Sequence, residues 1–234
     1  MNAFIEFLTL DNLTYMLFGL VWSVIYGVIV VLVGTILGII GAALKISKHK
    51  VLQSIGGLYT TVFIGTPMML QILFFAVALP QALSFTGIRF EPTTLGVVAM
   101  CLNAGAYQTE LIRSGILGVD KGQWEATETL GLSYFQAMRY VILPQAFKRI
   151  IPPLISEFMT LIKDSSLLYN IGAIELTASA SVLGSRSAGI MIPYLDAGIM
   201  YIVIYLILSR VEKKGLKKIQ KKEWMQSSLH VQRR

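Results

Sequence analysis

The stretch NLTYMLFGLVWSVIYGVIVVLVGTILGIIGAAL fills residues 12–44 without a single charged side chain. It is longer than the roughly 20 residues with which an α-helix crosses the hydrocarbon core of a bilayer. Two more uncharged runs follow, at 51–88 and 92–109. Hydrophobic residues make up 55% of the chain and charged residues 14%, against about 25% charged residues in an average soluble domain. The sequence therefore predicts an all-α protein that spans a membrane several times.

The orientation in the membrane follows from the basic residues, because loops rich in Lys and Arg stay in the cytoplasm. An odd number of spans, such as the five expected below, puts the two ends of the chain on opposite sides of the membrane. If the N-terminus is outside, the cytoplasmic pieces are 45–50, 113–150 and the tail from Arg210, which hold 17 of the 20 Lys and Arg residues. We therefore expect the N-terminus outside and the C-terminus inside. The apolar segments give five expected transmembrane helices, at roughly 13–44, 51–80, 92–113, 145–165 and 188–210.

The tail at 213–234 is strongly basic and is expected to be cytoplasmic, next to the lipid bilayer. No cluster of stacking aromatics and no nucleic-acid-binding motif accompanies its lysines, so we expect no nucleic-acid partner. His49 and His230 are isolated histidines that form no metal-ligand set, and the single Cys101 excludes an internal disulfide. We therefore expect no metal site.

Small residues near the inner end of the first span predict a close helix contact. Gly34 and Gly38 are four residues apart, which puts them on one helix face and lets a second helix approach. We expect that second helix to belong to the same chain. The alternative is a contact between two copies of the chain.

A polar segment at about 114–144 interrupts the apolar runs and is cytoplasmic in the predicted topology. Residues 122–130 are a short helix candidate, and Gly131 suits the left-handed position that ends a helix. Ser133 and Gln136 form an S-x-x-Q capping box that opens a second helix. Pro144 is expected to mark the turn into the fourth span. The second helix carries an apolar stripe of Tyr134, Phe135, Met138, Val141 and Ile142.

This elbow also carries a family pattern. Glu125-Ala126-Thr127, then Gly131, then Val141-Ile142-Leu143-Pro144 match E-A-A, three residues, G, nine residues, I-x-L-P. The pattern resembles the signature of the membrane subunits of ATP-binding-cassette importers with the type I fold. Further blocks resemble the polar amino acid subfamily of these permeases, at 64–75, 106–126 and 143–167, and the similarity covers roughly 14–210.

The chain departs from the family pattern at three positions. Thr127 replaces the second alanine of E-A-A, and Val141 replaces isoleucine; both are mild changes. Ile64 stands before Gly65-Thr66-Pro67, where the family usually has arginine. Any role of that arginine is absent here or is supplied by another residue.

The resemblance implies a single transmembrane permease domain at 1–212 whose elbow docks into a cleft on a separate ATPase subunit. On this interpretation the ATPase-coupling residues are Glu125, Ala126, Glu128, Gly131, Leu143 and Pro144. The alternative for Glu125 is a solvated acid that merely favours the helix dipole. Glu125 and Glu128 would make polar contacts with the partner, and Gly131 would set the bend.

The resemblance also implies partners and a location. The complex would hold two ATPase subunits, a second permease subunit as homodimer or heterodimer, and an extracellular substrate-binding protein, in a bacterial cytoplasmic membrane. The chain has no G-x-x-x-x-G-K-[ST] phosphate loop, so we expect it to bind no cofactor and to catalyse no covalent chemistry. ATP and magnesium would bind to the partner.

Two places put polar groups within apolar runs, and both are substrate-site candidates. Thr66 is a good N-cap and Pro67 suits the first helical position, so a half-helix is expected to start after Gly65 and to offer its free N–H groups to an α-carboxylate. The alternative is a simple proline kink. The second place is the fourth span, where Glu157 and Asp164 are seven residues apart and share a helix face.

Two acids on one face suit the ammonium group of an amino acid and a cationic side chain. Lys163 lies off that face and would neutralise one acid or hold the end of the helix. Asn103 and Glu110 share a face of the third span by the same spacing and are weaker candidates. The alternative is an internal ion-pair network that serves packing.

The leading interpretation is thus the permease subunit of an ATP-driven importer for polar amino acids. The alternative is a secondary amino acid transporter driven by an ion gradient, which explains the intramembrane acids but not the elbow. A scaffolding membrane protein without transport would need no charge in the fourth span.

Overall fold

The computed structural model describes residues 9–186 and 189–231, with side chains described up to residue 215. Within these ranges the chain is helical and forms no strand. In chain order the elements are α2 (Leu10–Ile46), α3 (Lys50–Gly65), α4 (Met68–Leu73), η1 (Phe74–Ala78), α5 (Leu79–Ala82), η2 (Ser84–Thr86), α6 (Pro92–Leu117), α7 (Lys121–Thr129), α8 (Tyr134–Ala137), η3 (Met138–Ile142), α9 (Leu143–Asp164), η4 (Ser165–Ile171), α10 (Leu176–Arg186) and α11 (Met191–Val231).

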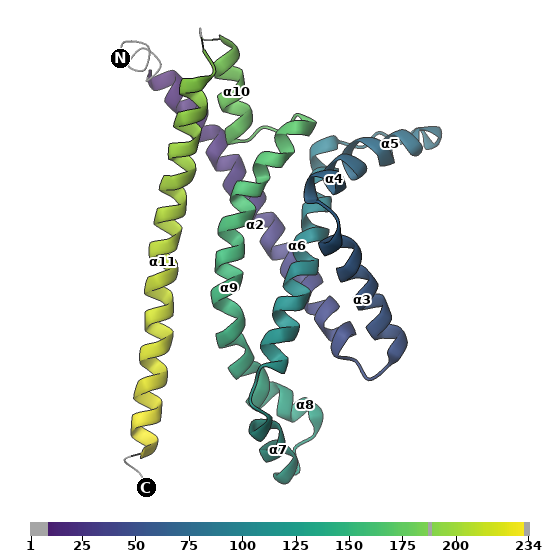
Figure 1. Ribbon diagram of the computed structural model, residues 1–234, viewed down its shortest axis with the longest axis vertical. Coiled ribbons are helices and arrows are strands. Elements are labelled where there is room, and N and C mark those ends of the chain that lie inside the picture. Colours follow the sequence, from purple (N-terminus) through teal and green to yellow (C-terminus); the bar gives the residue numbers. More distant parts are fainter. Residues whose placement is uncertain (1–8, 187–188, 232–234) are drawn as a thin grey trace.

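α6 is the central helix, with α2, α3, α4 and α9 packed around it (Figure 1). It packs most extensively against α2, whose Gly34, Gly38 and Gly41 face it. A Cβ on Gly38 would lie 2.8 Å from Cβ of Gln108, and one on Gly41 would lie 2.1 Å from Oγ1 of Thr109. The predicted small-residue seam is therefore confirmed as a contact within the chain.

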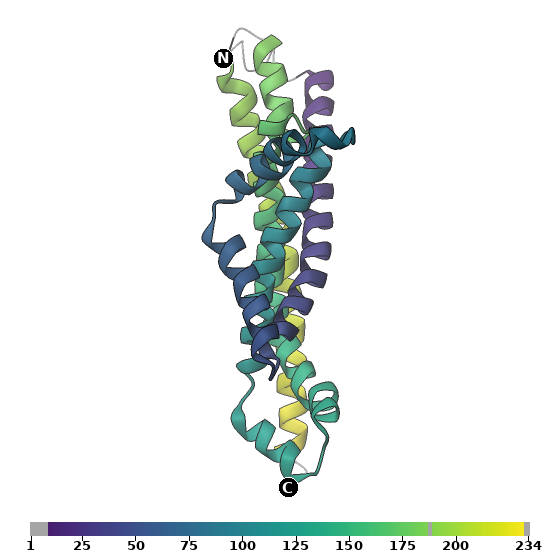
Figure 2. The same cartoon turned by 90° about the vertical axis from the view of Figure 1, so that its right-hand side faces the viewer.

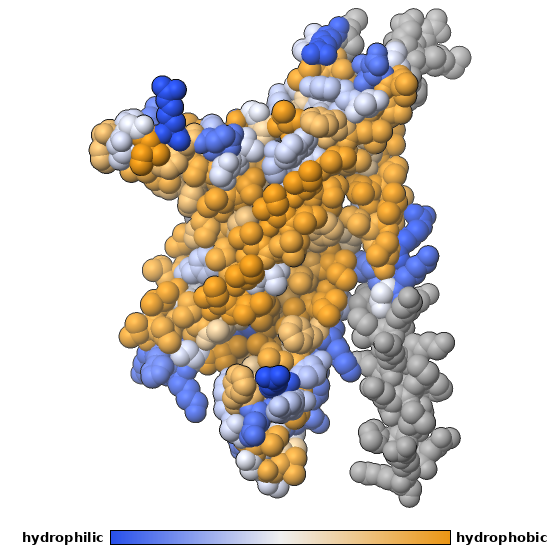
Figure 3. All heavy atoms as spheres, turned by 180° about the vertical axis from the view of Figure 1, so that it is seen from behind, coloured by the Kyte–Doolittle hydropathy of each residue, from blue (hydrophilic) through white to orange (hydrophobic). Residues whose placement is uncertain are grey.

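The surface between the two polar ends is apolar, as Figure 3 shows for the face formed largely by α2. Two helices are long and apolar enough to cross a membrane on their own, α2 and the Met191–Gly215 part of α11. Two bent helix pairs qualify when each pair is taken as one span, which gives up to four spans in the described residues. α6 is not among these helices, and its buried residues include the polar Asn103, Gln108 and Thr109. The number of five spans stays a prediction.

The first bent pair covers the segment that the sequence predicted as the second span, 51–80. The second bent pair includes the predicted fourth span, 145–165, and part of the loop expected after it. The helix Lys50–Gly65 meets the helix Met68–Ala82 at 101°, and Tyr134–Ile171 meets Leu176–Arg186 at 51°. The second of these breaks lies after Ile171, where Gly172 has a φ of 82°. The first break falls at Thr66 and Pro67, and these two residues line the pocket described in the next subsection.

Pro144 does not mark a turn, and this expectation was wrong. The helix runs on from α8 through η3 into α9, and the strain of the proline is relieved by a π-helical turn in front of it. The N–H of Leu143 reaches back five residues to the carbonyl of Met138, which widens the helix where the proline ring would otherwise meet a carbonyl. The same device precedes Pro80, where the N–H of Leu79 bonds to the carbonyl of Phe74.

Candidate functional site

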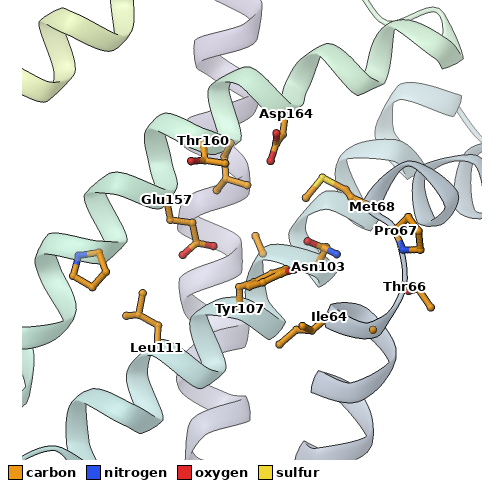
Figure 4. Close-up of a pocket in the computed structure, with 14 residues that line it drawn as sticks. Ile64, Thr66, Pro67, Met68, Asn103, Tyr107, Leu111, Glu157, Thr160 and Asp164 are labelled. Atoms are coloured by element: carbon orange, nitrogen blue, oxygen red, sulfur yellow. The ribbon is translucent and has the colours of Figure 1, made fainter.

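A cavity of about 830 Å³ opens between the bend after α3, one face of α6 and one face of α9 (Figure 4). α9 contributes residues at helical spacing, including Glu157, Thr160 and Asp164, whose side chains point towards the cavity. α6 contributes Asn103 and, one and two turns further on, Tyr107 and Leu111. The remaining lining residues are Ile64, Gly65, Thr66, Pro67, Met68, Ala104, Pro153 and Leu161.

The electrostatic character of this pocket is acidic. Glu157 and Asp164 line it, and none of its lining residues is Lys, Arg or His. Both carboxyl side chains are half-buried. Nε2 of Gln108, a fully buried side chain, lies 3.4 Å from Oε1 of Glu157 and donates to it. The pocket therefore presents negative charge and hydrogen-bond acceptors to whatever enters it.

The structure places the weaker candidate Glu110 outside this pocket, and it does the same for Lys163. Its side chain is exposed, and its ammonium nitrogen lies 5.8 Å from the ring centroid of Tyr205 on α11. Among the described residues, the ion pairs within 4.0 Å both involve Glu110, which contacts Lys45 and Arg113. The predicted alternative of an ion-pair network around Glu157 and Asp164 thus finds no support in the described part of the chain.

The break at the end of α3 has the predicted position but a different cap. α4 begins at Met68 with Pro67 as its N-cap residue, so the half-helix starts one residue later than the sequence suggested. Thr66 does not cap this helix. Its hydroxyl donates to the carbonyl of Val62, 2.7 Å away, and so satisfies one of the free carbonyls at the end of α3.

The elbow has the two helices and the turn that the sequence predicted. α7 ends at Thr129, and Gly131, two residues later, takes the left-handed conformation with a φ of 67°. The N–H of Gly131 bonds to the carbonyl of Glu128 and the N–H of Leu132 to that of Thr127. Both bonds of the capping box between Ser133 and Gln136 are present, and they open α8. The elbow projects from one end of the helix bundle (Figure 2).

The two faces of the elbow differ in exposure, and both carry apolar side chains. Its inner face packs on an apolar cluster that includes Ile142, Ala146 and Ile150, with Trp124, Met138 and Val141 against it. Its outer surface exposes Leu130, Phe135 and Tyr134, with 75%, 72% and 61% of their surface accessible. The predicted stripe is therefore divided, because its two aromatic residues face outwards. The predicted coupling residues Glu125, Ala126, Glu128, Gly131 and Pro144 are exposed as well, and Leu143 is partly buried.

Several residues of the site were not predicted from the sequence. Met68, Tyr107 and Thr160 line the pocket, and Gln71 and Gln108 lie behind it. A signal existed for the two glutamines, because a buried amide within an apolar run needs hydrogen-bond partners. For Tyr107 the signal was its position four residues after Asn103, on the same face of α6.

Comparisons with known proteins bear on this arrangement. Residues 34–214 match the protein family described as "Binding-protein-dependent transport system inner membrane component". The chain is 36% identical to the "Arginine transport system permease protein ArtQ" of Bacillus subtilis, over 91% of this chain and 95% of that protein. It is 33% identical to the "Putative glutamine transport system permease protein GlnP" of Rickettsia typhi, over 86% of this chain and 91% of that one.

A solved structure has the same fold. It is described as "Crystal structure of an amino acid ABC transporter with histidines", with a TM-score of 0.83 and 32% sequence identity. The superposition covers 89% of this chain and 95% of that one.

Proposed function

Because this chain belongs to the family of binding-protein-dependent transport system inner membrane components, we propose that it forms the path by which an ATP-driven importer moves polar amino acids across a membrane. The family favours this function over transport driven by an ion gradient. The choice of substrate rests on one observation, the composition of the pocket beside the bend between α3 and α4. Two carboxylates and the amide of Asn103 line this pocket, and none of its lining residues carries a positive charge.

A zwitterionic amino acid fits the polarity of this pocket. Its α-ammonium group would lie at Glu157 or Asp164, where a carboxylate accepts hydrogen bonds. Its α-carboxylate would lie at Gly65-Thr66-Pro67, near the start of the helix Met68–Ala82, since the first turn of a helix has free N–H groups and the positive end of the helix dipole. The two ends of the substrate would thus be held by opposite sides of the pocket.

The side chain of the substrate is proposed to be cationic or neutral and polar, and not acidic. With one carboxylate occupied by the α-ammonium group, the second remains for a side-chain donor. Ile64 adds to this preference. It lines the pocket at the position where the permeases that this chain resembles usually have arginine, and its side chain brings no positive charge to the pocket. Relatives named for arginine and glutamine transport, and a related structure described with histidines, agree with such a substrate.

We propose the predicted topology for the membrane: five spans, the N-terminus outside, a cytoplasmic tail at 213–234, and the elbow at 114–144 on the cytoplasmic side. Two ATPase subunits would bind ATP and magnesium and dock on the elbows of two permease subunits, while a substrate-binding protein would deliver the amino acid from outside. The exposed apolar groups of the elbow, Leu130, Phe135 and Tyr134, support a docking function.

Helix continuity suggests how the elbow would act on the pocket. The second limb of the elbow and the pocket-lining face belong to one helical segment, which runs from Tyr134 through Asp164. At 1.5 Å per residue, Tyr134 and Glu157 are roughly 35 Å apart along this helix. A displacement of the elbow by the ATPase would therefore move the carboxylates directly and switch the pocket between the two sides of the membrane.

The proposed function predicts a substrate-dependent ATPase. The chain is purified with a tag from its native membrane and reconstituted in lipid nanodiscs, and ATP hydrolysis is measured with each of the twenty amino acids and the binding protein. We expect a co-purifying ATPase subunit whose rate rises with one or a few cationic or neutral polar amino acids. Stimulation by aspartate or glutamate alone would contradict the acidic pocket, and a preparation without any ATPase subunit would contradict the proposed complex.

A further inference from the structure

Gln71 lies on α4, outside the cavity but directly behind the residues that line it. Its side chain is almost fully buried, with 7% of its surface accessible. Nε2 of Gln71 carries two hydrogens and lies within donating distance of three acceptors, the carbonyl of Phe63 at 2.9 Å, the carbonyl of Thr66 at 3.0 Å and Oγ1 of Thr66 at 2.7 Å, so that one hydrogen is shared between two of them. One amide group therefore ties the start of α4 to the end of α3 across the 101° bend.

The other end of the same amide holds Asn103. Oε1 of Gln71 accepts a hydrogen bond from Nδ2 of Asn103 at 3.0 Å, and Nδ2 of Asn103 also donates to the carbonyl of Phe63 at 2.8 Å. Both hydrogens of the Asn103 amide are thereby used. The carbonyl of Phe63 can only accept, so the amide nitrogen of Asn103 must face α3 and α4, and its oxygen must face the other way.

That oxygen, Oδ1 of Asn103, is buried and has no hydrogen-bond partner among the described residues. Asn103 is 2% accessible and lines the cavity. A buried carbonyl without a donor is costly, so its presence beside a cavity indicates a group that a ligand completes. Asn103 thus offers the pocket an acceptor whose direction is fixed by Gln71.

We propose that Gln71 is a positioning residue for substrate: it fixes the amide of Asn103 so that Oδ1 accepts a hydrogen bond from an N–H group of the amino acid. This inference rests on the proposed function of the pocket. Gln71 touches no substrate and acts through Asn103. Since both residues also brace the bend between α3 and α4, the substrate acceptor and the bend are parts of one hydrogen-bonded unit.

The test is a double-mutant cycle on equilibrium binding of the stimulating amino acid, radiolabelled, to the purified complex without binding protein. The variants are Gln71→Met, Asn103→Leu and both together, with Gln81→Met on the exposed surface of α5 as the matched control. Because loss of a hydrogen bond to a charged donor weakens binding by about 10- to 100-fold, we expect Asn103→Leu to fall in that range and Gln71→Met to weaken binding about tenfold. Thermal melting of every variant is measured in parallel.

The double variant gives the decisive comparison. If Gln71 acts through Asn103, the double variant binds no more weakly than Asn103→Leu alone, because the group that Gln71 orients is already gone. Multiplied losses in the double variant would overturn the inference, and so would unchanged binding by Gln71→Met. Absence of binding to the unsubstituted complex would instead overturn the proposed function, and this inference with it.

Discussion

Replacing both pocket carboxylates by their amides, Glu157→Gln and Asp164→Asn, is expected to abolish substrate-stimulated ATP hydrolysis while leaving the complex assembled. Each carboxylate offers a charge-assisted hydrogen bond worth about 1.5–3 kcal/mol, so each single variant should weaken substrate binding by about 10- to 100-fold. The amides keep the shape of the side chains and remove two charges from a site without a cation, so the fold should not lose stability.

The measurement for these variants is the stimulated ATPase rate in nanodiscs as a function of amino acid concentration. Glu212→Gln provides the matched control, because Glu212 lies on α11, is partly buried like the two pocket acids and contacts Ser156 outside the pocket. We expect the control to behave as the unsubstituted protein. Full stimulation in both single variants, Glu157→Gln and Asp164→Asn, would show that these acids do not bind the substrate.

The second large effect is expected at the elbow. Gly131→Val should reduce substrate-stimulated ATP hydrolysis to the basal rate and leave amino acid binding to the pocket intact. Gly131 has a φ of 67°, a conformation that costs a residue with a Cβ about 1–2 kcal/mol and a β-branched residue more. The turn between α7 and α8 would then change its geometry, so that the two limbs no longer fit the ATPase together.

Gly87→Val is the matched control for this substitution. Gly87 has a φ of 71° and, like Gly131, has nothing but its own chain neighbours within 4 Å of the position of a Cβ, but it lies after η2, away from the elbow. It should therefore carry similar backbone strain without loss of stimulation. An equal loss of stimulation in both variants would assign the effect to general destabilisation and would contradict coupling through Gly131.

The features that the sequence predicted well are those with local causes. The uncharged run at 12–44 became α2, because a segment of that length and composition has no other stable state in a membrane. The capping box of Ser133 and Gln136 and the left-handed Gly131 depend on residues within one turn of each other. The shared face of Glu157 and Asp164 follows from the period of a single helix.

The features that it missed depend on contacts between distant segments. Gln71 and Asn103 belong to different helices, and only the packing of α4 on α6 brings their amides together. The sequence put Lys163 off the face that the two acids share, but it could not show that the ammonium group lies near the ring of Tyr205 on α11. Pro144 was interpreted as a turn because a local rule ignores the π-helical alternative that this chain adopts.

The most direct test of the account is amino acid uptake by proteoliposomes that hold the chain with its ATPase partner. The vesicles contain ATP and magnesium, and the binding protein and a radiolabelled amino acid are outside. The account predicts accumulation that requires internal ATP and persists when ionophores remove every ion gradient. Accumulation that follows an imposed proton or sodium gradient without ATP would contradict it.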